Sequence, residues 1–570
     1  MSHVERRTAR SRRRARKAHG RAVASRLALL ILAALALLAS SCAGSDNSNS
    51  GIVTDVRAPQ TTQAPSANAI ANQSGAAGKL GYDGKELIAR QEGAAGESYA
   101  KIDENPFLDA ARAPLSTFAV DVDTASYSNT RRFLSEGQLP PKDAVRIEEL
   151  INYFPYDYPQ PAGNTPFSVK AEVADCPWDS RHKLVHIGLQ GRRLAAESLP
   201  PANLVFLVDV SGSMASPDKL PLVKSSLRTL AGQLTGRDRV AVVVYAGSSG
   251  LALPSTPGDR REEILSAVER LEAGGSTNGG QGIQLAYRIA EENFIRGGTN
   301  RVVLATDGDF NVGLTSDGEL VNLIEEKRRG GVFLSVLGFG TGNLNDSMME
   351  KLADKGNGNY AYIDTPAEAR KALGEQVAGT LATIAKDVKI QVEFNPRLVA
   401  GYRLIGYENR LLADRDFNDD RKDAGEIGAG HTVTALYEIV PAGQRVENPG
   451  VDELKYREPE QTRQEVGANE LLTVKLRYKE PDGDVSKPLN VGVPDSGASF
   501  QNASADFKFA AAVAEFGMLL RGSRYRGQSS FDNALELARA SAGADLRGYR
   551  AEFVGLVETA RRLSPHGTSD

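Results

Sequence analysis

An acidic residue and two serines follow a strongly apolar stretch of the chain, at a spacing that suits a hard metal ion. The stretch reads VFLVDVSGSM over residues 205–214 and places Asp209, Ser211 and Ser213 at alternate positions. Its apolar residues predict a strand buried on both faces, with the polar residues at the carboxyl end. One carboxylate and two hydroxyls are hard oxygen ligands, which suit Mg²⁺ or Mn²⁺ better than a soft metal.

Two stretches further along the chain offer ligands of the same kind. GGSTNGGQG places Thr277 in a glycine-rich loop before a predicted helix, and RVVLATDGDF ends a second buried strand at Asp307. Asp-x-Ser-x-Ser followed by Thr and then Asp resembles the metal-ion-dependent adhesion site of the von Willebrand factor type A family. All five positions of that motif are filled in this chain.

The resemblance implies a division of roles among the five residues. Ser211, Ser213 and Thr277 would ligate the ion as neutral hydroxyls, whereas Asp209 and Asp307 would act mainly through bound water. A cation that its direct ligands neutralise only in part keeps enough positive charge to attract an outside carboxylate. The partner expected for this site is therefore a protein that presents Asp or Glu.

The order of predicted elements places these residues on one edge of a sheet. Buried strands alternate with amphipathic helices over 203–383, which predicts a doubly wound, Rossmann-like α/β domain with a parallel sheet. Alternating strands on both sides, over 161–202 and 384–500, predict one β-sandwich into which the α/β domain is inserted. An N-terminal α/β flanking region over 79–160 and a small helical unit over 501–562 complete the predicted organisation.

The flanks resemble those of bacterial lipoproteins that carry a von Willebrand factor type A domain. The segments that carry the resemblance include PLSTFAVDVDTASYSNTRRFL and DAGEIGAGHTVTALYE. It covers the chain from about residue 100 to 562 and is specific for the order of the domains. It implies protein binding through a divalent ion at the cell surface.

The first residues have the pattern of an export signal. Ten of the first 26 residues are Arg or Lys, and a 13-residue apolar run, LALLILAALALLA, follows them. This run is too short to span a bilayer and suits a signal peptide over 1–42. LLASSC resembles a lipobox with Cys42 as the lipidated residue, although Ala39 stands where Leu is usual, so secretion without a lipid is the alternative. Residues 43–78 are predicted to be a disordered tether, and the chain is expected to be exported and anchored to the bacterial membrane or envelope.

These features favour a binding protein over an enzyme. The net charge of -4 does not indicate a nucleic-acid partner, and the chain contains no Walker loop, HExxH or GxSxG sequence, so no nucleotide is expected. Export also argues against a cytoplasmic ATPase as partner. A structural envelope scaffold remains the alternative, followed by a metal-dependent hydrolase of the cell envelope.

Three other features have simpler interpretations. Asp123 or Thr124 is predicted to cap the following helix, with a minor ion site at Asp121 and Asp123 as the alternative. The acidic loop 413–431 departs from the calcium-loop template and is interpreted as a solvated hairpin, with a calcium site of another type left open. Cys176 is interpreted as a small buried hydrophobic residue.

Overall fold

The computed structural model describes residues 96–120, 122–275, 279–308, 317–376, 379, 382–422, 424–446, 469–481 and 483–564. The predicted signal peptide, Cys42 and the predicted tether lie outside the described residues, as do Asp121 and Thr277. Within the described part of the chain, none of the helices combines the length and the apolar character needed to cross a bilayer.

The α/β unit is built on a six-stranded sheet in the order β10-β9-β8-β5-β6-β7. Neighbouring strands are parallel, except that β7 runs antiparallel to β6. The central strands β5 and β8 are buried along nearly their whole length, as their continuous apolar runs predict. The strands are β5 (Ala202–Asp209), β6 (Arg239–Tyr245), β7 (Ser249–Pro257), β8 (Thr299–Thr306), β9 (Phe333–Phe339) and β10 (Tyr360–Ile363).

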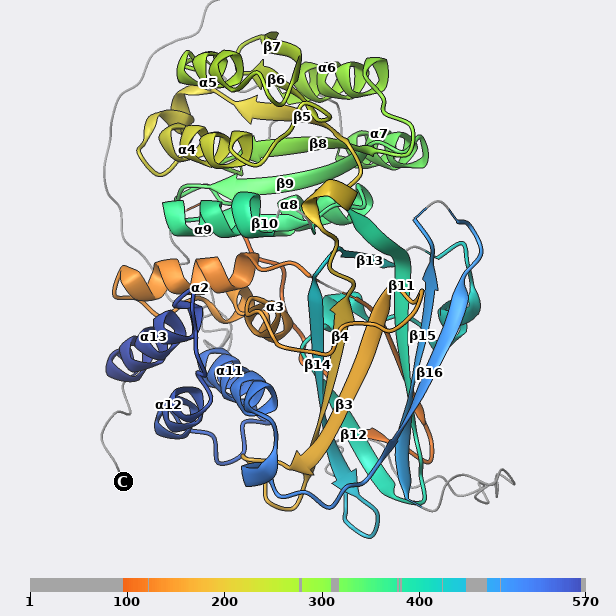
Figure 1. Ribbon diagram of the computed structural model, residues 1–570. Coiled ribbons are helices and arrows are strands. Elements are labelled where there is room, and N and C mark those ends of the chain that lie inside the picture. Colours follow the sequence, from red (N-terminus) through yellow and green to blue (C-terminus); the bar gives the residue numbers. More distant parts are fainter. Residues whose placement is uncertain are drawn as a thin grey trace, which may run out of the picture. The chain divides into compact units, whose positions relative to one another are not determined.

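Helices cover both faces of this sheet (Figure 1). The helices α4, α5 and α9 share one apolar core with the sheet, and α6, α7 and α8 share a second core with the opposite face. This arrangement confirms the predicted doubly wound fold. The helices are α4 (Leu220–Ala231), α5 (Arg261–Glu269), α6 (Gly279–Glu292), α7 (Asp317–Arg329), α8 (Asp346–Lys355) and α9 (Pro366–Arg370).

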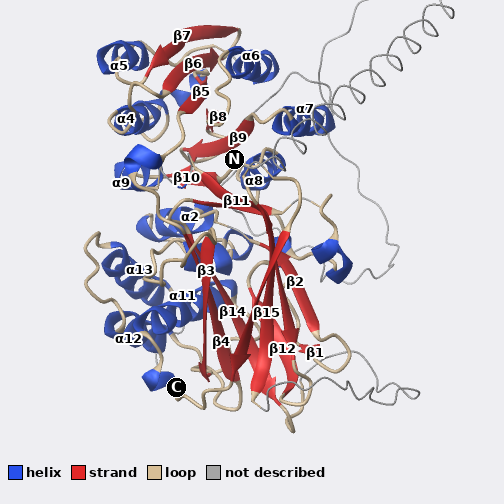
Figure 2. Ribbon diagram, turned by 45° about the vertical axis from the view of Figure 1, so that its right-hand side comes forward, coloured by secondary structure: helices blue, strands red, loops and turns tan. Residues whose placement is uncertain are grey.

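Two antiparallel sheets form a β-sandwich from strands on both sides of the α/β unit (Figure 2). One sheet has the order β1-β12-β14-β4-β3, so β4 pairs with β3 from before the α/β unit and with β14 from after it. Residues of both sheets share one apolar core. The strands of the first sheet are β1 (Leu108–Asp109), β3 (Phe167–Asp175), β4 (Lys183–Gly191), β12 (Val399–Ile405) and β14 (Thr432–Pro441).

The second sheet also takes a strand from the N-terminal flank. Its order is β13-β11-β15-β16, and β2 pairs with β11 in addition, with Thr117 opposite Gln391. The segment 115–119, which the sequence places in a separate α/β flanking region, therefore contributes directly to the sandwich. The strands are β2 (Leu115–Ala119), β11 (Thr383–Phe394), β13 (Gly425–Gly428), β15 (Glu470–Lys479) and β16 (Lys487–Pro494).

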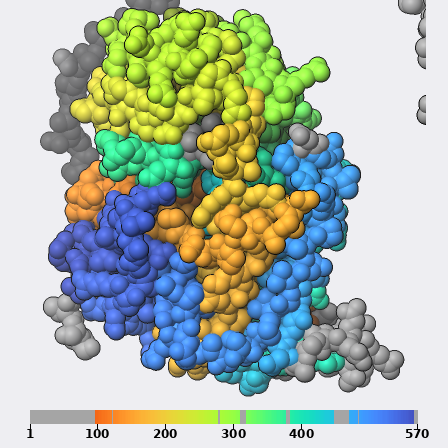
Figure 3. Space-filling model, in the orientation of Figure 1, coloured from red at the N-terminus to blue at the C-terminus, as the bar shows by residue number. Residues whose placement is uncertain are grey.

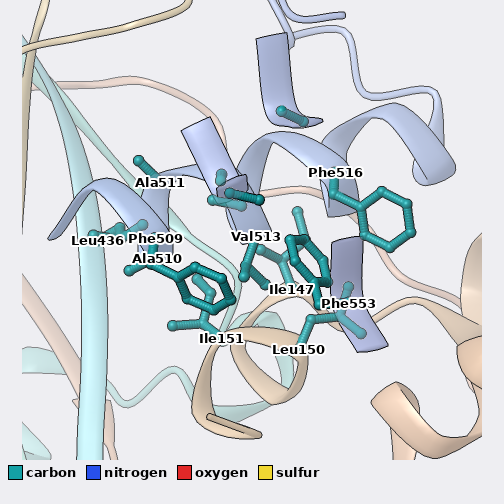
Figure 4. Packing of buried hydrophobic residues seen from close by; sticks show 14 of the residues in the cluster. Ile147, Leu150, Ile151, Leu436, Phe509, Ala510, Ala511, Val513, Phe516 and Phe553 are labelled. Atoms are coloured by element: carbon teal, nitrogen blue, oxygen red, sulfur yellow. The ribbon is translucent and has the colours of Figure 1, made fainter. Parts of the chain in front are cut away.

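The C-terminal helices pack against helices of the N-terminal flank. Figure 3 shows the C-terminal segment in blue beside N-terminal segments in orange. Side chains of α3 and α11, together with Phe553 of α13, meet in one apolar cluster (Figure 4). The helical unit is thus part of a core shared with residues some 400 positions earlier in the chain. The helices are α2 (Ala125–Ser135), α3 (Ile147–Asn152), α11 (Ala505–Arg521), α12 (Phe531–Ala540) and α13 (Tyr549–Leu563).

The last helical segment of the α/β unit is irregular. The amphipathic pattern indicates a helix over 366–383; α9 ends at Arg370, a π-helical segment, η4 (Lys371–Glu375), follows it, and residue 379 is again helical. Strand β11 then begins at Thr383, which is opposite Gly428 of β13. Strand pairing with the sandwich therefore overrides the helical pattern at the end of this segment.

Because His186 of β4 is buried, we expect the free energy of unfolding to depend on pH. Its ring Nε2 lies 2.8 Å from the Tyr158 hydroxyl, and burial lowers its pKa to about 4. The unfolded side chain titrates near pH 6.5, so acidification between these two values favours the unfolded chain, by up to about 1.4 kcal/mol per pH unit. Stability should be intact above pH 6.5 and fall as the pH approaches 4.

Urea denaturation of wild type and His186→Asn at about pH 7.5, 6 and 5 tests this expectation. The variant should be less stable at the highest pH and should lose less stability on acidification. His431, whose pKa burial also lowers to about 4, contributes the same slope to both proteins. Parallel pH profiles for the two proteins would contradict the prediction.

Candidate metal centre

Two parallel strands bring Asp209 and Asp307 to the same edge of the sheet. Asp209 is the last residue of β5, and Asp307 directly follows β8. The two strands pair in parallel, with Val208 opposite Ala305, so their carboxyl ends coincide. Both aspartates have no exposed surface. This edge of a parallel sheet is where doubly wound folds bind their ligands.

The turn after β5 places two hydroxyls beside these carboxylates. The backbone N–H of Ser211 donates to Asp209 Oδ1 over 2.8 Å, and the hydroxyl oxygens of Ser211 and Ser213 lie 3.0 Å apart. Ser211 is buried, whereas Ser213 is exposed. The site therefore combines buried acidic groups with an exposed serine next to them.

The chain that leads to Thr277 also reaches this turn. The Gly212 N–H donates to the Gly275 carbonyl over 3.1 Å, and the Gly274 N–H donates to the Val210 carbonyl over 2.8 Å. The residue two positions before Thr277 is thus held beside the two serines. The structure brings together four of the five predicted residues, and Thr277 itself lies outside the described residues.

The two aspartates differ in their electrostatic environment. Burial raises the pKa of Asp209 to about 6, and the nearby Asp307 acts in the same direction, while hydrogen bonds from Ser211 oppose the shift. Burial acts to raise the pKa of Asp307 as well, but hydrogen bonds from Lys219, Ser213 and Asn343 outweigh it and lower that pKa. Asp307 is therefore the more strongly held anion.

A lysine that sequence reasoning missed completes this environment. Lys219 precedes α4, is 7% exposed, and donates from Nζ to Asp307 Oδ2 over 2.8 Å. It also approaches Asn343 Oδ1, at 3.3 Å. One signal was available in the sequence, since a cation at the start of a helix is unfavourable for the helix dipole and calls for another reason.

The donor set fits a hard divalent cation. Asp209 Oδ2 is buried and has no well-formed hydrogen bond within the described residues, although the Tyr245 hydroxyl faces this carboxylate. A buried carboxylate oxygen beside two hydroxyls is an arrangement that Mg²⁺ or Mn²⁺ can use directly or through water. Across the described ranges, no three His, Cys, Asp or Glu side chains gather as metal ligands, and this candidate set includes hydroxyls as well as carboxylates.

The helix cap predicted for Asp123 or Thr124 is confirmed in position only. Thr124 occupies the position before α2, but its side chain makes no capping hydrogen bond. Asp123 instead accepts from the Tyr360 N–H over 2.8 Å and pairs with Arg410 at 3.1 Å. The residue thus joins the N-terminal flank to β10 and to the segment after β12, rather than starting a helix.

Carboxylates of the acidic loop 413–431 also have partners in the protein. Asp420 accepts from the Ser486 hydroxyl and pairs with Arg477 at 3.4 Å. Lys389 donates to the carbonyl oxygens of Asp416 and Asp419. These contacts tie the loop to β11, β15 and the start of β16. Cys176 is buried, as predicted, and burial raises the pKa of its thiol well above the ordinary value.

Three families of known proteins match this chain. Residues 203–376 match the family described as von Willebrand factor type A domain, 94–186 match one described as von Willebrand factor, and 379–563 match "Uncharacterized protein YfbK, C-terminal". The match to the von Willebrand factor type A domain, over 203–376, spans the α/β unit and the sheet edge that carries Asp209 and Asp307. The molecule is thus a von Willebrand factor type A domain with characteristic flanks on both sides.

The whole-chain similarity then gives the particular family. The chain is 45% identical over 469 residues to "Uncharacterized protein YfbK" of Escherichia coli K12, with 81% of this chain and 80% of that protein covered. It therefore belongs to the YfbK family of von Willebrand factor type A domain proteins.

Other known proteins are similar to this chain at lower identity. Human inter-alpha-trypsin inhibitor heavy chain H3 is 26% identical over 269 residues, which are 43% of this chain and only 29% of that protein. A solved von Willebrand factor type A protein from Catenulispora acidiphila is 17% identical, covers 67% of this chain and 88% of its own, and has a TM-score of 0.39.

Proposed function

We propose that this chain is an exported binding protein that holds an acidic residue of a partner protein through Mg²⁺ or Mn²⁺. The ion would be held by Asp209, Ser211, Ser213, Thr277 and Asp307, and the chain would be anchored to the envelope by a lipid on Cys42. The observation that carries the proposal is the meeting of two buried carboxylates and two serine hydroxyls, with Ser213 exposed, at one sheet edge. Protein binding is common in the family to which the α/β unit belongs.

The proposed chemistry is binding without turnover. The bound ion would supply a positive charge at the accessible side of the site, to which a carboxylate could coordinate. The hydroxyls would orient the ion, and Asp209 and Asp307 would hold its water ligands and balance its charge. This division would place the two carboxylates on the buried side of the ion and leave the side of Ser213 to the partner.

Metal titration of the full-length protein tests the site directly. Isothermal titration calorimetry should detect uptake of Mn²⁺ by wild type, and Asp209→Asn and Ser213→Ala should weaken it about 10- to 100-fold. Ser216→Ala is the matched control, because Ser216 lies three residues further on and its hydroxyl bonds to Asp218. Absence of Mn²⁺ uptake, or equal uptake by Asp209→Asn, would refute the proposed site.

Capture from envelope extracts distinguishes binding from the alternatives. Partner capture that requires Mg²⁺, is abolished by EDTA and is lost in Asp209→Ala is the expected result. Capture that survives both changes would indicate a structural scaffold. Conversion of an envelope substrate by the purified protein would indicate a hydrolase.

A further inference from the structure

Lys219 adds a positive charge to a site whose predicted residues include two charged side chains, Asp209 and Asp307. Its Nζ is 2.8 Å from Asp307 Oδ2, and its side chain is 9% exposed while that of Asp307 is fully buried. A buried pair at this distance interacts through a medium less polar than water, so the lysine charge strongly influences any ion that binds beside Asp307. The von Willebrand factor type A motif described above does not include this position.

A glycine in a neighbouring loop leaves room for the Lys219 side chain. Gly340, which follows β9, has a φ of +74°, and a Cβ at that position would come within 2.3 Å of Lys219 Cγ. Asn343, in the same loop, offers its side-chain oxygen to the ammonium. Two features of one loop thus accommodate the lysine, which sets it apart from a surface lysine that happens to lie near an acid.

The charge count shows what this lysine would do to a loaded site. Ionised Asp209 and Asp307 carry two negative charges and Lys219 carries one positive charge. A divalent cation bound among them leaves one positive charge in excess, whereas without the lysine the same group would be neutral. The lysine therefore repels the metal and attracts an incoming carboxylate.

We propose that Lys219 is a specificity-determining residue that weakens the hold of the site on its divalent ion and strengthens the binding of a carboxylate to the ion once bound. This inference rests on the proposed function, because it needs an ion at the site. It also assigns the accessible side of the site a preference for singly charged carboxylate groups over neutral oxygen ligands.

Two titrations of the full-length protein test the inference. In calorimetry, Lys219→Met should bind Mn²⁺ about tenfold tighter than wild type. At saturating Mn²⁺, the binding of acetate to the ion can be followed by water proton relaxation, because acetate displaces bound water. The affinity for acetate should be about threefold or more lower in Lys219→Met than in wild type. Lys224→Met is the matched control, since Lys224 lies on α4, just after Lys219, is only partly buried and bonds to the Glu269 carbonyl.

A second variant, Lys219→Gln, separates the effect of the charge from an effect on folding. Lys219→Gln keeps a hydrogen-bond donor for Asp307 without the charge and should behave like Lys219→Met, which covers the case in which methionine prevents folding. Equal Mn²⁺ affinity in wild type and in both variants, or equal acetate affinity, would overturn the inference and leave the proposed function intact. No Mn²⁺ uptake by wild type would overturn both.

Discussion

Replacing Arg131 with methionine is expected to lower the free energy of unfolding by about 3–5 kcal/mol. The guanidinium of Arg131, on α2, contacts Glu368 at 2.7 Å and Glu552 at 2.9 Å, and it is bidentate to Asp364. The side chains of Arg131, Asp364 and Glu368 are nearly fully buried. Removing the cation would leave these carboxylates in a poorly solvated place without their partner, and this loss accounts for most of the expected effect.

Urea denaturation at neutral pH measures this loss. Arg112→Met is the matched control, because Arg112 pairs with Asp109 at 3.6 Å on the surface and should contribute under about 1 kcal/mol. Adding Asp364→Asn and Glu368→Gln to Arg131→Met should restore part of the stability by removing the buried anions. A change below about 1 kcal/mol in Arg131→Met would contradict the role assigned to this arginine.

Phe553→Ala is the second substitution with a large expected effect, about 3–5 kcal/mol. Phe553 has no exposed surface and makes edge-to-face contacts with Phe154, Phe509 and Phe516, with ring centroids 5.3 to 5.5 Å apart. Figure 4 shows it at the centre of the cluster that α3 and α11 share. The substitution would open a cavity between α3 and the C-terminal helices and loosen these helices.

Denaturation and limited proteolysis together test this expectation. Phe553→Ala should unfold at lower urea and become more susceptible to cleavage between α11 and α13. Phe294→Ala is the matched control, since Phe294 is 41% exposed and its removal should change stability by about 0.5 kcal/mol or less. Equal protease resistance in wild type and Phe553→Ala would refute the idea that this ring fastens the helical unit.

The sequence predicts the fold well where the signal is local. The apolar runs that end at Asp209 and Asp307 identify two buried parallel strands and place both acids at one edge, as the structure confirms. The alternating strands on both sides of the α/β unit also predict a shared sandwich, because a chain that leaves and re-enters a domain needs close ends.

The parts that the sequence does not predict depend on contacts between distant residues. Asp123 binds Tyr360 and Arg410, which lie more than 200 positions away, so a local cap is the simpler but incorrect interpretation. The role of Lys219 depends on Asp307, 88 positions further along. The pattern of helix 366–383 gives no indication that Thr383 pairs with β13, because strand pairing is decided by the partner as well as by the segment itself.

The pairing of β4 with strands from both flanks sets the order in which the molecule can be completed. During synthesis from the N-terminus, β3 and β4 are made before the inserted unit, whereas β14 and β15 follow it. Until then, the main-chain groups of β4 on the side of β14 have no neighbouring strand, which is the condition under which strand edges join other chains. The first sheet of the sandwich can therefore be completed only after the inserted α/β unit has been synthesised.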